Sequence, residues 1–128
     1  MSPTSTRRVT TLVVEDSLAV RRRLCELLTA EGCAEIVAEV GTAREGLLAF
    51  ERFRPQAVVL DISLPDGTGL DLLRHIKQVA PFCFAIVMTQ FHEPVFADVA
   101  RTLGADCFFH KSTEFERIIE TLQALALE

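Results

Sequence analysis

The feature that most constrains the fold is a regular alternation between short apolar runs and stretches with helical spacing. The runs are rich in β-branched and other apolar residues, and they occupy residues 9–15, 35–40, 57–61, 84–88 and 106–110. Between the runs, apolar residues recur three and four positions apart, which is the spacing of one buried helix face. A strand followed by a helix, repeated five times, predicts an α/β fold with a parallel sheet.

The runs are nearly continuous in their apolar residues, unlike strands that keep one face in water. Continuous apolar strands are typical of a parallel sheet that has helices on both faces. The sequence therefore predicts a doubly wound α/β domain with five strands. Thr42 and Thr113 each precede a glutamate by three residues and are predicted to cap helices, while Gly32 and Gly104 are predicted to end them.

Length and composition indicate one globular domain. The 128 residues are 49% hydrophobic, which is enough to bury roughly 70% of the unfolded surface. We expect a flexible tail at residues 1–8 and a single domain at residues 9–128. No apolar run approaches the ~20 residues that cross a bilayer, so we expect a cytoplasmic protein. The four cysteines have no metal-binding spacing and are expected to be buried thiols.

The net charge of −5 argues against nucleic acid as the main partner, because phosphate backbones are held by clustered cations. The run of arginines at residues 21–23 is the local exception. We expect it to form a solvated helix face, and the functional alternative is that it helps to dock an acidic partner. His75, His92 and His110 share no metal-ligand spacing and are interpreted as surface or loop histidines.

Five polar side chains follow the predicted strands at the points where the strands end. They are Glu15, Asp16, Asp61, Thr89 and Lys111. In an open parallel sheet, ligands bind beyond the carboxyl ends of the strands. We therefore expect three acids, a hydroxyl and an ammonium to converge on one edge of the sheet.

The chemistry of such a set favours a divalent cation. Ionised carboxylates about 4 Å apart repel one another by roughly 4 kcal/mol per pair at an effective dielectric constant near 20. Magnesium prefers oxygen ligands and commonly binds through one or two carboxylates together with a phosphate. Asp61 beside Mg²⁺ and Lys111 is then a nucleophile that can accept a phosphoryl group. Thr89 can donate a hydrogen bond to that group.

Together these residues resemble the receiver domain of two-component response regulators. The similarity covers residues 9 to 127 and includes Glu15-Asp16, Asp61 with Leu64-Pro65 and Gly67-x-Gly69 behind it, Thr89, and Phe108 three residues before Lys111. The resemblance implies the flavodoxin-like strand order 2-1-3-4-5. It also implies Asp61 as phosphoacceptor, Asp16 and the backbone carbonyl of Ser63 as Mg²⁺ ligands with Glu15 acting through water, Thr89 and Phe108 as a switch pair, and Lys111 as the phosphoryl-binding cation.

The resemblance further implies partners and output. A histidine kinase or a histidine phosphotransfer protein would supply the phosphoryl group, and the signal would leave through the face made by the fourth helix, fifth strand and fifth helix to a downstream protein. Such a protein is a phosphoacceptor and not an enzyme that turns over a small substrate. The alternatives are a phosphate sink, a relay intermediate, or a receiver excised from a longer regulator. We expect a monomer or weak dimer, with Val95, Phe96 and Val99 as core or interface.

Two positions depart from the usual receiver pattern. Ser112 stands where most receivers have a proline in a cis peptide bond. Because a cis bond before a residue other than proline costs about 2.5 to 4 kcal/mol, we predict a trans Lys111–Ser112 bond, with Ser112 or Thr113 capping the last helix. Gln90 stands where most receivers have a small residue, and its bulk is expected to affect phosphoryl lifetime and donor preference.

Two other function classes are disfavoured. An aspartate-nucleophile phosphatase of the haloacid dehalogenase type needs a second acid two residues after the nucleophile, where this chain has Ser63. A nucleotide-binding module needs a complete glycine motif, but Gly67-x-Gly69 is only a fragment, because Leu72 replaces the third glycine.

Overall fold

The computed structural model describes residues 8–128, so nearly all of the predicted tail at residues 1–8 lies outside the described residues. Five parallel strands form one sheet in the order β2-β1-β3-β6-β7, which confirms the predicted doubly wound topology. These strands are β1 (Val9–Val14), β2 (Ala34–Val40), β3 (Ala57–Asp61), β6 (Phe84–Thr89) and β7 (Cys107–His110).

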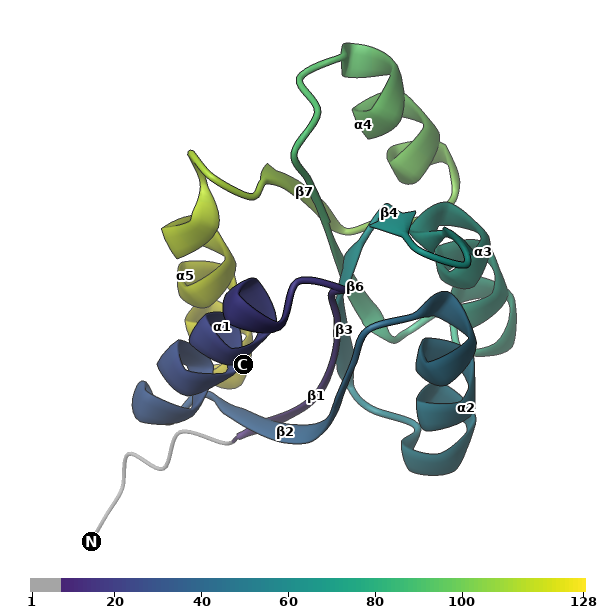
Figure 1. Cartoon of the computed structure of the whole chain (residues 1–128). Coiled ribbons are helices and arrows are strands. Elements are labelled where there is room, and N and C mark those ends of the chain that lie inside the picture. Colours follow the sequence, from purple (N-terminus) through teal and green to yellow (C-terminus); the bar gives the residue numbers. More distant parts are fainter. Residues whose placement is uncertain (1–7) are drawn as a thin grey trace, which may run out of the picture.

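Five helices cover the two faces of the sheet, as Figure 1 shows. They are α1 (Leu18–Ala30), α2 (Ala43–Phe53), α3 (Gly69–Val79), α4 (Pro94–Thr102) and α5 (Phe115–Ala126). Helices α1 and α5 lie on one face, and α2, α3 and α4 lie on the other. None of these described helices has the length and apolar character needed to cross a membrane.

Both faces of the central strands are buried. In β3, Ala57 and Val59 pack against the α1 and α5 side, whereas Val58 and Leu60 pack against the α2, α3 and α4 side. All four residues have 0% exposure. A strand that contributes alternate residues to two cores carries mostly apolar side chains on both faces, and this explains the nearly continuous apolar runs in the sequence.

A small antiparallel hairpin interrupts the alternation after β3. Its strands are β4 (Ser63–Leu64) and β5 (Gly67–Thr68), and the sequence indicated only a turn there. At its tip, the Asp66 carboxylate accepts hydrogen bonds from the backbone N–H groups of Ala43 and Arg44, at 2.8 and 2.9 Å. These bonds lower the pKa of Asp66 and attach the hairpin to the first turn of α2.

The prediction that Thr42 and Thr113 cap helices is correct for Thr42 and wrong for Thr113. Thr42 caps α2 by accepting a hydrogen bond from the Glu45 N–H. Helix α5 instead begins at Phe115 with Glu114 in the cap position, so neither Ser112 nor Thr113 caps it. The Glu114 carboxylate folds back onto the His110 N–H at 2.9 Å, and this contact closes the turn before the helix.

The remaining local predictions can be compared directly. Residues 8–128 contain no cis peptide bond, so the Lys111–Ser112 bond is trans, as predicted. Gly32 and Gly104 follow the ends of α1 and α4 with φ angles of 70° and 104°, as predicted for helix ends. The four cysteines are free thiols, of which Cys107 is only half-buried.

Candidate functional site

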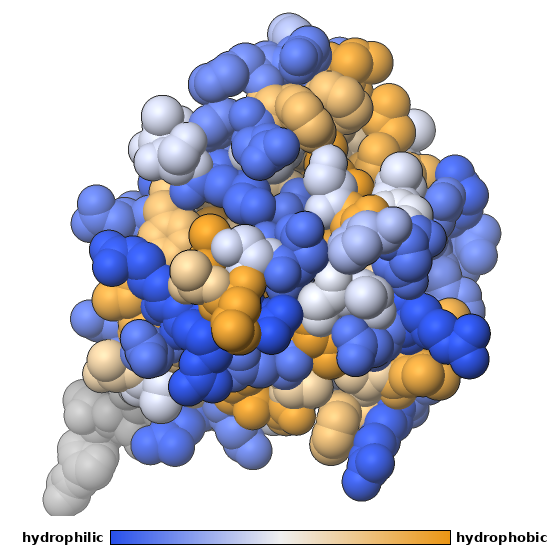
Figure 2. All heavy atoms as spheres, in the orientation of Figure 1, coloured by the Kyte–Doolittle hydropathy of each residue, from blue (hydrophilic) through white to orange (hydrophobic). Residues whose placement is uncertain are grey.

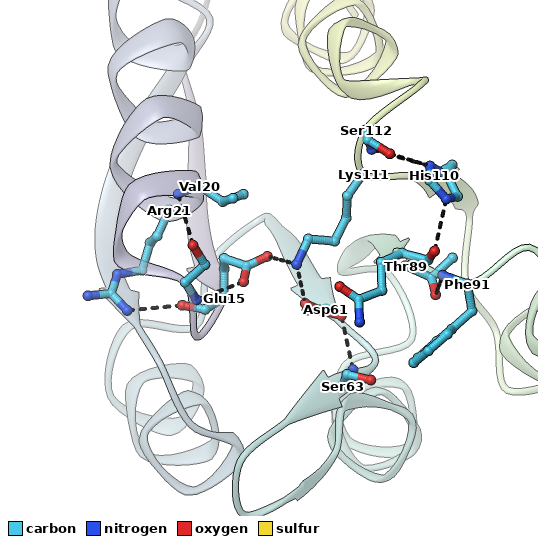
Figure 3. A network of polar contacts seen from close by, with 12 residues as sticks. Glu15, Val20, Arg21, Asp61, Ser63, Thr89, Phe91, His110, Lys111 and Ser112 are labelled. Carbon is cyan, nitrogen blue, oxygen red and sulfur yellow. Dashed lines mark hydrogen bonds and ion pairs between the residues drawn. The ribbon is translucent and has the colours of Figure 1, made fainter.

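The side chains predicted for the site all lie at the carboxyl edge of the parallel sheet. Glu15 and Asp16 directly follow β1, Asp61 ends β3, Thr89 ends β6, and Lys111 directly follows β7. Parallel pairing brings these strand ends to one edge of the sheet. Figure 3 shows Glu15 and Lys111 pointing toward Asp61.

The three acids form one cluster. One carboxylate oxygen from each of Glu15, Asp16 and Asp61 lies within 4.8 Å of the other two. Glu15 and Asp61 are buried, with 0% and 2% exposure, whereas Asp16 is open to solvent. The cluster therefore has two fixed, buried members and one member that faces the water.

A single ammonium group contacts both buried acids. Lys111 Nζ lies 2.7 Å from Asp61 Oδ2 and 2.8 Å from Glu15 Oε1. Burial alone would lower the pKa of Lys111, but its contacts with Asp61 and Glu15 outweigh burial and raise it. Lys111 therefore stays charged, and it offsets only part of the negative charge of the cluster.

Glu15 is the least satisfied member of the cluster. Its Oε2 accepts the Ser17 N–H at 2.9 Å, whereas Oε1 is buried and has no hydrogen bond of acceptable geometry, in spite of its short ion-pair distance to Lys111. Burial raises the pKa of Glu15 from 4.5 to about 7, and the nearby charge of Asp61 adds to this effect. The contacts with Lys111 and Ser17 lower the pKa only partly.

The donor set fits a hard divalent cation. Three carboxylates converge, and one buried oxygen, Glu15 Oε1, has no hydrogen bond. A bound cation would give this oxygen a partner. Oxygen donors of this kind suit Mg²⁺ more than zinc or copper, which favour nitrogen and sulfur ligands. The Ser63 N–H donates to Asp61 Oδ1 at 2.9 Å, so the backbone of Ser63 lies at the cluster, and the ligand role of its carbonyl stays a prediction.

The shifted pKa of Glu15 predicts a stability that depends on pH. Between about pH 4.5 and 7, the Glu15 carboxyl group is protonated in the folded protein but ionised in the unfolded chain. Glu15 therefore contributes its full stability below pH 4.5, and this contribution is lost as pH rises through about 7. Glu15→Gln cannot ionise, so its stability relative to wild type should rise by up to about 3 kcal/mol between acid and alkaline pH. Urea unfolding at both pH values, without divalent ions, measures this difference.

The control for that experiment is Glu26→Gln, which removes an exposed glutamate from α1. Its unfolding free energy relative to wild type should stay constant over the same pH range. An equally constant difference for Glu15→Gln would contradict the assignment of the raised pKa to Glu15.

Thr89 and Phe108 lie on neighbouring strands beside the cluster. Thr89 is buried, and its Oγ1 accepts the Phe91 N–H at 2.9 Å, which leaves the hydroxyl hydrogen available for donation. Phe108 pairs with Val87 in the sheet register and is half-buried against the core on the α2, α3 and α4 side. Phe91 packs against the same core and stacks on Phe96, with ring centroids 5.3 Å apart.

The expectation of a solvated arginine face is wrong for Arg21. Its Nη1 donates to the main-chain carbonyl of Glu15 at 2.9 Å, and its Nε lies 3.3 Å from Glu39 Oε1. Arg22 also pairs with Glu39, at 3.0 Å, although it is largely exposed. Arg21 thus stabilises the turn that carries Glu15 and Asp16. In the sequence, the only sign of this role was the position of Arg21 one helical turn after Ser17.

Two of the histidines form a pair that the sequence did not indicate. The rings of His92 and His110 stack with centroids 4.1 Å apart and an interplanar angle of 19°. His92 is exposed and His110 is half-buried, and they come from the loop after β6 and the end of β7. His75 lies apart from them on α3, where its Nε2 is 3.7 Å from Glu51.

Comparisons with known proteins agree with this geometry. A model of the response regulator receiver domain family matches residues 11–123. The transcriptional regulatory protein UhpA of Escherichia coli is 31% identical over 92% of this chain and 59% of its own length. The chemotaxis protein CheY of Thermotoga maritima is 26% identical over 90% of this chain and 95% of its own length.

Solved structures give the same picture. A CheY-like response regulator receiver domain protein from Methanospirillum hungatei has a TM-score of 0.83 and 25% identity over 93% of this chain and 94% of its own. A response regulator of the LuxR family from Aurantimonas has a TM-score of 0.85 and 25% identity over 93% of this chain and 85% of its own. Among the curated relatives, UhpA and the mycobacterial PdtaR are longer proteins, of which the chain spans 59% and 55%.

Proposed function

The chain belongs to the response regulator receiver domain family, and from this premise we propose that Asp61 accepts a phosphoryl group from a histidine kinase or a histidine phosphotransfer protein. The observation that carries the proposal is the cluster in which three carboxylates lie within 4.8 Å and Lys111 Nζ lies 2.7 Å from Asp61. A nucleophilic carboxylate beside a fixed cation and a candidate metal site is suited to phosphoryl transfer.

Asp61 is the nucleophile of the proposed reaction. The Ser63 N–H holds Oδ1 and Lys111 holds Oδ2, so both oxygens of the carboxylate are fixed in direction. A carboxylate oxygen attacks the phosphorus atom, forming a phosphorus–oxygen bond as the phosphorus–nitrogen bond of the phosphohistidine donor breaks. The electron pair of that bond stays on the departing imidazole nitrogen, and the product is an aspartyl phosphate.

The residues around Asp61 bind the group that is transferred. Glu15, Asp16, Asp61 and the Ser63 carbonyl are the proposed site for Mg²⁺, which when bound would offset charge on the phosphoryl oxygens. Lys111 is the proposed partner for a phosphoryl oxygen, since it already contacts the accepting carboxylate. Gln90 is exposed and lines an 800 Å³ groove together with Lys111, so its amide borders the approach of a phosphodonor.

The proposed output is a change of shape on the face formed by α4, β7 and α5. A phosphoryl group adds a charge of about −1.5 to −2, which would draw the Thr89 hydroxyl toward Asp61 and let Phe108 turn into the vacated space. Val95 and Val99 are already exposed on α4, at 56% and 39%, and Figure 2 shows apolar surface where α4 lies. A downstream protein would bind this face.

Incubation of the wild-type protein with a small acyl phosphate and Mg²⁺ tests the proposal. We expect one phosphoryl group per chain, labile to acid in the way of an acyl phosphate, and little incorporation when a chelator removes the divalent ion. Borohydride reduction followed by peptide mass spectrometry should locate the group at Asp61. Incorporation that is stable to acid, or located at a histidine or serine, would contradict the proposal.

A further inference from the structure

His110 makes a side-chain bridge between the loop that follows Thr89 and the loop that carries Lys111. Its Nε2 lies 3.0 Å from the carbonyl oxygen of Gln90, in the loop after β6. Its Nδ1 lies 3.3 Å from the Ser112 N–H and 3.1 Å from the Ser112 hydroxyl, in the loop after β7. Figure 3 shows His110 with Ser112 on one side and the chain beyond Thr89 on the other.

The partners of the bridge fix its chemical form. A carbonyl oxygen only accepts hydrogen bonds, so Nε2 must carry the hydrogen that Gln90 accepts. A backbone N–H only donates, so Nδ1 must keep its lone pair for Ser112. His110 is therefore assigned as the neutral imidazole with its hydrogen on Nε2. A protonated ring would carry a hydrogen on Nδ1 as well and would lose the bond from the Ser112 N–H, while it could still donate to the Ser112 hydroxyl and to the Gln90 carbonyl.

The bridge adds to a short backbone connection at the same place. The Lys111 N–H donates to the main-chain carbonyl of Thr89 at 2.7 Å. This bond joins the two segments just before the His110 bridge. Beyond that bond the two backbones separate, and the imidazole of His110 spans the gap to Gln90 and Ser112. The ammonium group of Lys111 contacts Asp61. The residue that follows Lys111, Ser112, is held by the His110 ring.

We propose that His110 is a positioning residue for phosphoryl transfer, because its neutral imidazole holds the loop that carries Lys111 against the loop that follows Thr89. This inference rests on the proposed function. Ser112 supplies the N–H of the bridge, and a proline at that position has no N–H to donate. In this chain, a hydrogen-bonded side chain therefore restrains the segment after Lys111.

Charged and titratable groups surround His110. His92 stacks on one face of the ring, with the ring centroids 4.1 Å apart. The Glu114 carboxylate accepts the main-chain N–H of His110 and also pairs with Arg117, at 2.9 Å in each case. Lys111 is the neighbour in sequence. These groups contact the face of the ring and the backbone of His110, and they leave the bonds of its two nitrogens to Gln90 and Ser112 in place.

The test compares His110→Phe with His75→Phe. Phenylalanine keeps an aromatic ring against His92 but removes both nitrogens, and His75 is a histidine of similar exposure on α3, far from the bridge in the sequence. With a small acyl phosphate and Mg²⁺ near pH 8, we expect phosphorylation of His110→Phe to be roughly tenfold slower than that of His75→Phe, since a displaced catalytic group can cost up to about 100-fold. His110→Gln, whose amide supplies one donor and one acceptor as the neutral imidazole does, should recover part of the lost rate.

The outcomes separate this inference from the proposed function. Equal rates in the two variants, or no recovery of rate in His110→Gln, would overturn the positioning role while phosphorylation itself stays intact. A lack of phosphate in the wild type and in both variants would overturn the proposed function as well. Nitrogen-15 NMR of the unphosphorylated protein tests the bridge directly. The Nε2-hydrogen form is expected, and the Nδ1-hydrogen form would overturn it.

Discussion

Asp61→Asn is expected to take up no measurable phosphate from an acyl phosphate or a phosphohistidine protein. The asparagine amide is neutral and is therefore a far weaker nucleophile than the anionic carboxylate. The shape of the side chain hardly changes, so the Ser63 N–H can still donate to its Oδ1 as it does to Asp61 Oδ1 at 2.9 Å. Mass spectrometry of the intact protein measures the loss.

The control is Asp71→Asn, which changes an exposed acid in the first turn of α3 and should leave incorporation at the wild-type level. Phosphate on Asp61→Asn with the same acid lability would mean that another carboxylate is the acceptor. Asp16 would then be the first candidate, because it belongs to the same cluster and is open to solvent.

The same variant has an electrostatic consequence in the absence of phosphate. Burial keeps the pKa of Glu15 near 7, and the charge of Asp61 contributes to the increase. Asp61→Asn removes that charge and leaves Lys111 with one ionised partner in place of two, so the pKa of Glu15 should fall. Carbon-13 NMR of the glutamate carboxyl groups would show the shift, and a pKa that stays near 7 would contradict the shared role of Lys111.

Gly69→Ala is expected to destabilise the fold by about 3 kcal/mol, although alanine is the better helix former. Gly69 is the first residue of α3, and its N–H donates to the carbonyl of Ile62 at 2.9 Å. A Cβ atom at this position would lie 2.0 Å from the main-chain oxygen of Asp61 and 2.9 Å from a methyl group of Leu60. Because the nearest atom belongs to the backbone, relief of the overlap must move the strand end that carries Asp61.

Two measurements check this expectation. Urea unfolding should give a lower midpoint for Gly69→Ala, whereas Gln78→Ala, an exposed position on the same helix, should stay within about 0.5 kcal/mol of wild type. Phosphate uptake by the folded fraction of Gly69→Ala should fall at least about tenfold, because Asp61 is displaced from Lys111. Stability and uptake equal to wild type would show that α3 shifts without moving Asp61.

The alternation of apolar runs was sufficient to predict the sheet and its two layers of helices. The period of the pattern reflects burial, and a strand such as β3 is apolar up to its last residue, Asp61, because both of its faces are covered. The same reasoning placed Glu15, Asp61 and Lys111 at one edge, since the ends of parallel strands must meet there. These predictions needed only the order of the elements along the chain.

The turns were harder to predict because their geometry depends on distant partners. Thr113 resembled a helix cap, but the Glu114 carboxylate binds the His110 N–H and moves the start of α5 to Phe115. The tip of the β4–β5 hairpin caps α2 through Asp66, 22 and 23 residues from its two partners. No local pattern in the sequence encodes a bond between such separate segments.

The sequence by itself determined the fold class and the residue types that meet at the carboxyl edge, because both follow from short-range periodicity and from the parallel direction of the strands. Only the tertiary structure decided how those residues share charge and hydrogen bonds. It gave Lys111 two acidic partners, left Glu15 Oε1 buried without a hydrogen bond, and gave the side chains of Arg21 and His110 backbone partners on other segments. Such pairings depend on distances of a few ångströms between segments far apart in the chain, and the energy of a buried charge or hydrogen bond changes steeply over those distances.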